Sequence, residues 1–258
     1  MKKIITGFLF WLLLSSAVSL LTAQQTAPTE PFRFQFRLGL EAEIFKRDIT
    51  YDEAQSTTPL NSYFTTLRLE AEIADGYIFS LIGGYASSNY KSLIFRQLPF
   101  SVEFEGGGLG GTLFGAELSK VFPFNSFGVG GQVRFLSYSG SEKKWLVPDL
   151  AVEGELKSTP SWQELSAGPV LAYLGYENFI PFLSVQYNYL SGKFILRELI
   201  ENLTGEETKE IKAKAKFSLS ACATLILSSH LSFRGEATYL PHKGGSDWSL
   251  NLRGIFSF

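Results

Sequence analysis

Residues 32–44 alternate strictly between apolar and polar side chains over thirteen positions. One face carries Phe32, Phe34, Phe36, Leu38, Leu40, Ala42 and Ile44, and the other carries Arg33, Gln35, Arg37, Gly39, Glu41 and Glu43. A period of two indicates a β-strand with two different faces. Strands of soluble sandwiches usually run about five or six residues, whereas a strand tilted through a bilayer needs about nine to eleven. The length of this alternation therefore favours a membrane-spanning strand.

Nine further segments repeat the pattern, and the connections between them alternate between short and long. The expected strands are 32–44, 63–73, 77–85, 104–118, 127–135, 165–173, 183–189, 213–225, 231–239 and 247–258. Long connections include 139–160 and 191–210, the second with a short helical piece near 194–202, while Asp75-Gly76 marks a tight hairpin turn. This organisation predicts an all-β fold, a closed up-and-down antiparallel transmembrane β-barrel of ten strands, with short periplasmic turns and longer extracellular loops.

The aromatic residues test this arrangement, because membrane barrels carry aromatic girdles at both interfaces. With ten strands imposed, one group falls at the outer end: Tyr63, Tyr85, Phe135, Tyr187, Tyr189, Tyr239 and Trp248. A second group falls at the periplasmic end: Phe32, Phe34, Tyr77, Phe79, Phe127, Tyr173, Phe256 and Phe258. The alternative is a soluble barrel, which would hold the whole aromatic set in its interior and turn its charges to water. The two girdles favour the membrane barrel.

The N-terminus has the layout of a secretory signal peptide, with Lys2 and Lys3 before an apolar run that ends at Ala23. We expect cleavage of 1–23, a short periplasmic segment at 24–31 and a barrel over 32–258; an uncleaved membrane anchor is the alternative. Removing the two lysines leaves 21 basic against 25 acidic residues, a net charge of about −4, which argues against nucleic-acid binding. The single cysteine, Cys222, excludes an internal disulfide framework.

The last strand alternates apolar residues and ends on an aromatic one. The matching residues are Trp248, Leu250, Leu252, Phe256 and Phe258. This end resembles the terminal signature of bacterial outer-membrane β-barrels, a general resemblance that covers 32–258 without indicating a subfamily. The resemblance implies residence in the outer membrane, contact with its lipid and lipopolysaccharide, and insertion by the outer-membrane barrel assembly machinery.

A set of charged residues shares the face that would point into the barrel: Arg37, Glu41, Arg68, Glu70, Glu117, Arg134, Arg234, Glu236 and Arg253. They could line an ion pathway or fill the interior. Buried charges are costly unless they are paired, and ten strands leave a narrow interior. We therefore expect a paired lumen network, with one ion pair between Glu236 and Arg253 on neighbouring strands.

Nothing in the pattern indicates a catalytic group, a cofactor or a metal. His242 at the outer rim lacks an adjacent Asp in the sequence, with Asp247 a distant candidate, and His230-Leu231-Ser232 falls on a periplasmic turn. The expected function is a non-enzymatic barrel with a structural or loop-mediated role. A narrow porin-like channel for small solutes and an outer-membrane hydrolase remain as alternatives.

Overall fold

The computed structural model describes residues 35–51, 56–73, 76–98, 101–104, 107–146, 154–200 and 202–258. These residues form antiparallel strands: β1 (Gln35–Tyr51), β2 (Ser56–Ile73), β3 (Tyr77–Tyr90), β4 (Leu93–Phe95), β5 (Val102–Phe104), β6 (Leu109–Phe124), β7 (Phe127–Gly140), β8 (Lys143–Leu146), β9 (Gly154–Tyr173), β10 (Phe179–Ile200), β11 (Leu203–Ala213), β12 (Phe217–Ile226), β13 (Leu231–His242) and β14 (Gly245–Ser257). The expected signal peptide at 1–23 and the segment at 24–31 lie outside the described residues. No helix among the described residues is long and apolar enough to cross a membrane.

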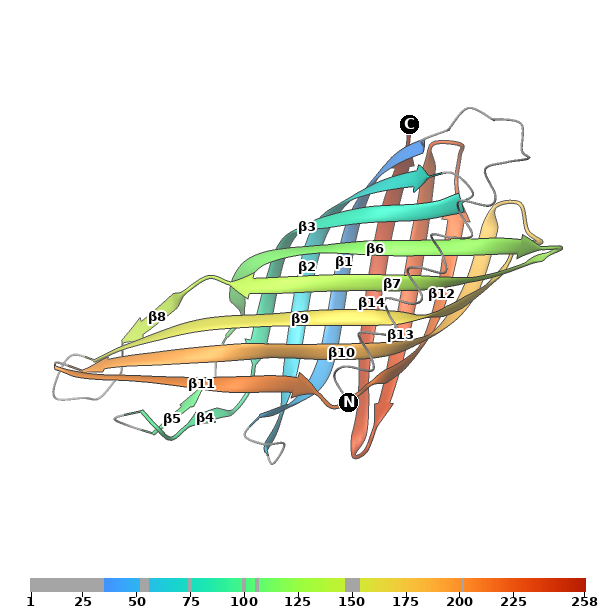
Figure 1. Ribbon diagram of the computed structural model, residues 1–258. Coiled ribbons are helices and arrows are strands. Elements are labelled where there is room, and N and C mark those ends of the chain that lie inside the picture. Colours follow the sequence, from blue (N-terminus) through green and yellow to red (C-terminus); the bar gives the residue numbers. More distant parts are fainter. Residues whose placement is uncertain are drawn as a thin grey trace, which may run out of the picture. The chain divides into compact units, whose positions relative to one another are not determined.

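Ten of the strands close into a ring. Its order is β1, β2, β3, β6, β7, β9, β10, β12, β13 and β14, and β14 pairs with β1 to complete it. Figure 1 shows the red C-terminal strand beside the blue β1, with neighbours in the chain side by side elsewhere. The β2–β3, β6–β7, β9–β10 and β12–β13 connections and Phe258 lie at one end of the ring, called here the turn end, and the opposite end is called the loop end. The β13–β14 connection at the loop end is a turn of two residues, Lys243 and Gly244, although the alternation of short and long connections predicts a long one there. The predicted ten-stranded up-and-down antiparallel barrel is confirmed.

The long connections differ from the prediction. The helical piece expected near 194–202 is wrong, because β10 continues to Ile200 and returns as β11 in a hairpin with ten paired positions. The expected strand 213–225 is also wrong as one unit, since β11 ends at Ala213 and β12 begins at Phe217. Phe104, the first residue of the expected strand 104–118, lies instead in the separate β4–β5 hairpin and is buried. Burial of apolar side chains at the loop end accounts for the first and third differences, whereas the second is a break at 214–216 between two stretches that both pair with β10.

A second ring closes above the first at the loop end. There β1 leaves β14, and its Ile49 and Thr50 pair with Ala213 and Lys212 of β11. Since β11 also pairs with β10, the ring comprises β1, β2, β3, β6, β7, β9, β10 and β11. This eight-stranded ring bypasses β12, β13 and β14, which end below it.

The two rings have opposite polarity, and β10 passes through both. In the ten-stranded ring its Leu183 and Val185 are about half exposed on the outside, whereas Ser184, Gln186 and Asn188 are buried inside. In the eight-stranded ring its Phe194 and Leu196 are fully buried inside, and Lys193 and Arg197 are exposed outside. An apolar outside suits lipid and a polar outside suits water. The ten-stranded ring is therefore the membrane-spanning part, and the eight-stranded ring projects from it.

The exposed aromatic side chains agree with the two girdles that the sequence predicts. All seven residues of the predicted outer girdle are exposed, as are Tyr77, Phe79, Phe127, Phe256 and Phe258 of the inner one. Tyr173 is half-buried, and Phe32 and Phe34 lie outside the described residues. Phe122, Phe124 and Phe179 add to the turn end.

Candidate functional site: the barrel lumen

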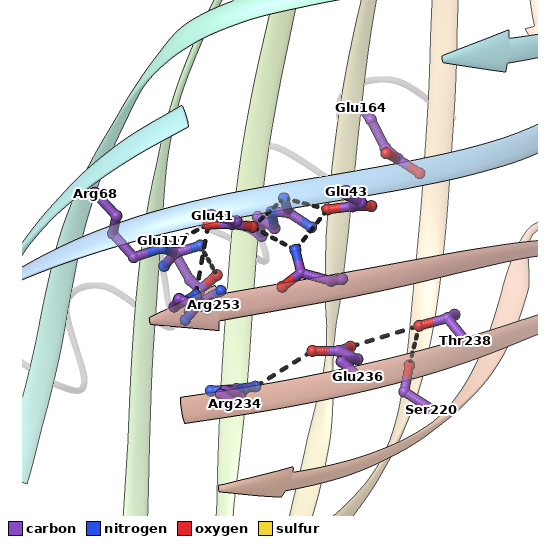
Figure 2. A network of polar contacts seen from close by, with 12 residues as sticks. Glu41, Glu43, Arg68, Glu117, Glu164, Ser220, Arg234, Glu236, Thr238 and Arg253 are labelled. Carbon is purple, nitrogen blue, oxygen red and sulfur yellow. Dashed lines mark hydrogen bonds and ion pairs between the residues drawn. The ribbon is translucent and has the colours of Figure 1, made fainter. Parts of the chain in front are cut away.

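The ion pairs of the lumen centre on Glu41, which is fully buried on β1. Its carboxylate accepts from Arg68 Nε at 2.9 Å and from Arg134 at 3.2 Å, and Arg253 Nε lies 3.5 Å away. These partners come from β2, β7 and β14, as Figure 2 shows for Arg68 and Arg253. Three strands are thereby tied to one carboxylate in the middle of the barrel.

Further carboxylates complete the pairing of these arginines. Glu117 accepts from Arg68 at 3.1 Å, and Glu70 lies 3.6 Å from Arg253. Sequence reasoning missed Glu43, which accepts from Arg134 at 2.7 Å and from the Asn251 amide at 2.9 Å. The signal for Glu43 was present, since it shares a face of the first strand with Glu41. A buried charge is costly unless it is paired, and Arg68, Arg134 and Arg253 each have at least two carboxylates within 4.0 Å.

The remaining predicted members lie at the edge of this network. Arg37 pairs with Glu72 and lies 4.0 Å from Glu70. Arg234 pairs with Glu236 at 3.4 Å along the same strand. The predicted Glu236–Arg253 pair is wrong. The register sets Arg253 opposite Arg234, so that Arg253 turns to Glu41 and Glu70 while Glu236 lies opposite Asn251.

A vestibule occupies the lumen at the turn end. It has a volume of about 500 Å³ and ends on Arg37, Arg234 and Arg253 of the network. Its walls are largely apolar and include Ile78, Val121, Val170, Ile180, Phe182 and Ile226. On the other side of the network, the cavity among Glu43, Arg47, Arg134 and Glu164 has only about 30 Å³, which is room for a water molecule or two. The lumen therefore narrows sharply at the network.

An apolar core fills the loop end of the lumen. Phe194 packs edge-on against Tyr90, with ring centroids 5.0 Å apart, and contacts Phe95 and Phe104 of the β4–β5 hairpin at 5.7 and 4.9 Å. Trp162 is buried against Phe45 and donates its indole N–H to Ser88. The core comprises buried side chains from all around the eight-stranded ring, among them Ile49, Leu60, Phe64, Leu109, Leu113, Leu136, Tyr138, Leu190, Leu196 and Ile211.

The β4–β5 hairpin is held inside the eight-stranded ring by polar contacts as well. The backbone N–H of Gln97 donates to the buried carboxylate of Glu207 at 2.7 Å, and Lys209 pairs with the same side chain at 2.6 Å. Lys209 also lies over the Phe95 ring. The hairpin is thus held at the loop end by both packing and charge, and its sequence carried no pattern that predicted this position.

The loop-end rim brings together residues that the sequence keeps far apart. His242 Nε2 lies 3.4 Å from Asp48 Oδ2 and 3.4 Å from Asp247 Oδ1. His242 has no adjacent Asp in the sequence, but the fold brings it to Asp247, the distant candidate, and to Asp48, because β1 and the β13–β14 hairpin converge here. His230, by contrast, directs its Nδ1 to the Ser257 carbonyl at the turn end, 3.0 Å away.

The five residues of the expected assembly signal, Trp248, Leu250, Leu252, Phe256 and Phe258, are all exposed on the outside of β14 and at its end. They form part of the apolar band of the ten-stranded ring. A closed ring with such a band outside and charges inside is the architecture of outer-membrane β-barrel proteins.

No protein-family model and no curated protein sequence matches the chain. Among solved structures, the chain is similar to the outer membrane protease OmpT from Escherichia coli, with 10% identity and a TM-score of 0.42 over 90% of this chain and 100% of that one. It is similar to the COG4313 outer membrane channel from Pseudomonas putida F1, with 10% identity and a TM-score of 0.44 over 91% and 100%. It is also similar to Ail, the attachment invasion locus protein of Yersinia pestis, with 9% identity and a TM-score of 0.35 over 87% and 97%.

Proposed function

We propose that the protein is a non-enzymatic barrel of the bacterial outer membrane, that its lumen is closed, and that it acts through the strands that project from the membrane. The observation that carries this proposal is the double closure of the lumen. The ion-pair network around Glu41 fills the middle, and the apolar core around Phe194 fills the loop end. A solute would have to displace both.

The projecting strands supply an interaction surface. The tips of β9, β10 and β11 form a groove of about 430 Å³ lined by Glu155, Lys157, Arg197 and Glu206, among others. Arg197 and Glu206 are exposed and paired at 2.5 Å, and the hydrogen bond to Glu206 raises the pKa of the Arg197 guanidinium. Such a mixed-charge groove on a rigid hairpin suits a polar partner outside the cell, such as the sugar and phosphate groups of lipopolysaccharide or a protein surface.

A narrow channel is the second candidate, because the vestibule of about 500 Å³ leads to the arginines of the network from the turn end. In this case the β4–β5 hairpin would act as a gate.

Planar-bilayer recording distinguishes the closed barrel from the channel. The refolded barrel, first verified by a heat-modifiable gel shift, is compared with a variant in which 93–104 is replaced by a short Gly/Ser linker.

Silence from both proteins supports the closed lumen. Discrete current steps from the intact chain would overturn it and favour the channel, and steps from the deletion variant alone would identify the hairpin as a gate. The absence of catalysis is tested separately, by incubating the folded barrel in lipopolysaccharide with fluorogenic peptides and lipid A. Cleavage that is lost in a His242→Gln variant would overturn the non-enzymatic assignment.

A further inference from the structure

The point where the two rings part is built from three segments. After Lys46, which is still paired with Trp248 of β14, β1 turns away toward β11. The Asp48 carbonyl accepts from the Lys214 N–H at 2.9 Å, and the Asp48 N–H donates to Asp247 Oδ1 at 2.8 Å. Asp48 is therefore held between β11 and the β13–β14 hairpin.

The hairpin presents His242 and Asp247 to Asp48 across its own turn. Gly244 adopts a φ of 97°, which permits the tight reversal between them. The His242 side chain is 3% exposed and that of Asp247 is 0% exposed, whereas Asp48 remains 21% exposed. The three side chains thus form a cluster in which two members are buried and the third is partly open to water.

The distances match those of a bound metal ion. The three ligand atoms lie within 4.8 Å of one another, and two of the three separations are 3.4 Å. Zinc binds imidazole nitrogen at about 2.0–2.1 Å and carboxylate oxygen at about 2.0–2.2 Å in a tetrahedron, which separates ligand atoms by about 3.4 Å. A single ion can reach all three groups with small adjustments of Asp48.

Direct hydrogen bonding does not account for the arrangement. His242 Nε2 is buried and has no hydrogen-bond partner, because neither carboxylate meets it with the required geometry. Asp247 Oδ2 is buried and likewise lacks a partner. The other ring nitrogen, Nδ1, lies 3.3 Å from the Lys243 carbonyl and can donate to it. That hydrogen bond leaves a lone pair on Nε2, which lies 3.4 Å from an oxygen of each carboxylate. Metal-binding histidines likewise donate their other ring N–H to a carbonyl or carboxylate.

Arg47, which precedes Asp48, makes its hydrogen bonds elsewhere. Arg47 donates to Glu164 at 3.3 Å and to the Trp248 carbonyl at 3.2 Å, and to neither Asp48 nor Asp247.

We propose that Asp48, His242 and Asp247 bind a divalent transition-metal ion of the zinc class, which fastens β1 to the β13–β14 hairpin where the rings part. The imidazole favours zinc, nickel or copper over calcium and magnesium, which prefer oxygen ligands. Three protein ligands leave a fourth position for water on the exposed side of Asp48. The site goes beyond the proposed function and does not depend on it.

The test uses the full barrel refolded in detergent and stripped of metal with a chelator. Zinc binding is measured by calorimetry, and cobalt(II) serves as a spectroscopic probe because its visible absorption reports tetrahedral coordination. His242→Gln and Asp48→Asn remove one ligand each. His230→Gln is the matched control, since the chain has only two histidines and His230 lies at the turn end. A heat-modifiable gel shift verifies that each variant folds.

We expect one zinc ion per barrel, tetrahedral cobalt bands and a higher unfolding midpoint with zinc. His242→Gln and Asp48→Asn should each weaken zinc binding by about tenfold or more, while His230→Gln leaves it unchanged. A folded wild-type barrel that binds no zinc would overturn the proposal. So would equal binding by the wild type and the Asp48→Asn or His242→Gln variant, or loss of binding in His230→Gln.

Discussion

Replacing Glu41 by glutamine should destabilise the barrel more than any other single removal of charge from the lumen. The amide keeps the size of the side chain and removes its charge. Three arginines, Arg68, Arg134 and Arg253, lose an anionic partner at 2.9, 3.2 and 3.5 Å. Removing one partner of a buried ion pair costs about 3–5 kcal/mol, because the other charge stays buried without compensation.

Part of that loss is offset here, since Arg68 keeps Glu117 and Arg134 keeps Glu43. We therefore expect Glu41→Gln to lower the free energy of unfolding by about 3 kcal/mol, the lower end of the range. A shift of that size changes the folding equilibrium by roughly 100-fold. The matched control is Glu206→Gln, whose pair with Arg197 is exposed and screened by water, so that its loss should change the stability little.

The assay is urea unfolding of the barrel in lipid vesicles, followed by tryptophan fluorescence and analysed by linear extrapolation. A Glu41→Gln/Arg253→Gln double variant should lose less stability than the sum of the two single losses, because each change relieves the charge that the other leaves unpaired. If Glu41→Gln lost no more than Glu206→Gln, the network would not hold the barrel together and the reasoning would fail.

Three other substitutions probe the fold. Gly84→Ala should cost about 1–3 kcal/mol and slow refolding, because an ideal Cβ would lie 2.2 Å from a carbonyl oxygen of β2, whereas Gly83→Ala, with nothing within 4 Å, should be neutral. Phe194→Ala should cost about 3–5 kcal/mol in urea unfolding and expose the β4–β5 hairpin to limited proteolysis; an intact hairpin would contradict this. Leu252→Lys on the lipid face should cost about 2–4 kcal/mol, while Leu199→Lys beyond the membrane should change little.

The membrane-spanning ring could be predicted from the sequence because the pattern that specifies each strand lies within that strand's own residues. Each strand carries its own alternation, and the parity of Phe36 to Ile44 on β1 agrees with the observed faces. The nine predicted lumen charges also follow from parity alone. Partner choice does not, because it depends on the register between strands, which is why Arg253 meets Glu41 instead of Glu236.

The loop end could not be predicted in this way. Along β10 the apolar residues lie on the outer face before Leu190 and on the inner face after it. The outer face beyond Leu190 therefore carries the charged residues Lys193 and Arg197, and a charged segment is typical of a loop although this one is part of a strand. The rim cluster depends on contacts between Asp48 and residues about two hundred positions later in the chain. Neither feature has a local signature.

The central claim is that one barrel passes from lipid into water while its polarity reverses. Single cysteines placed on the outer face of β10, in a Cys222→Ala background, can carry an environment-sensitive fluorophore in vesicles that contain brominated lipids. At Leu183 the fluorophore should be quenched strongly, and at Leu199, on the same face of the same strand, it should not be quenched. Equal quenching at both positions would place the eight-stranded ring in the membrane and contradict the account.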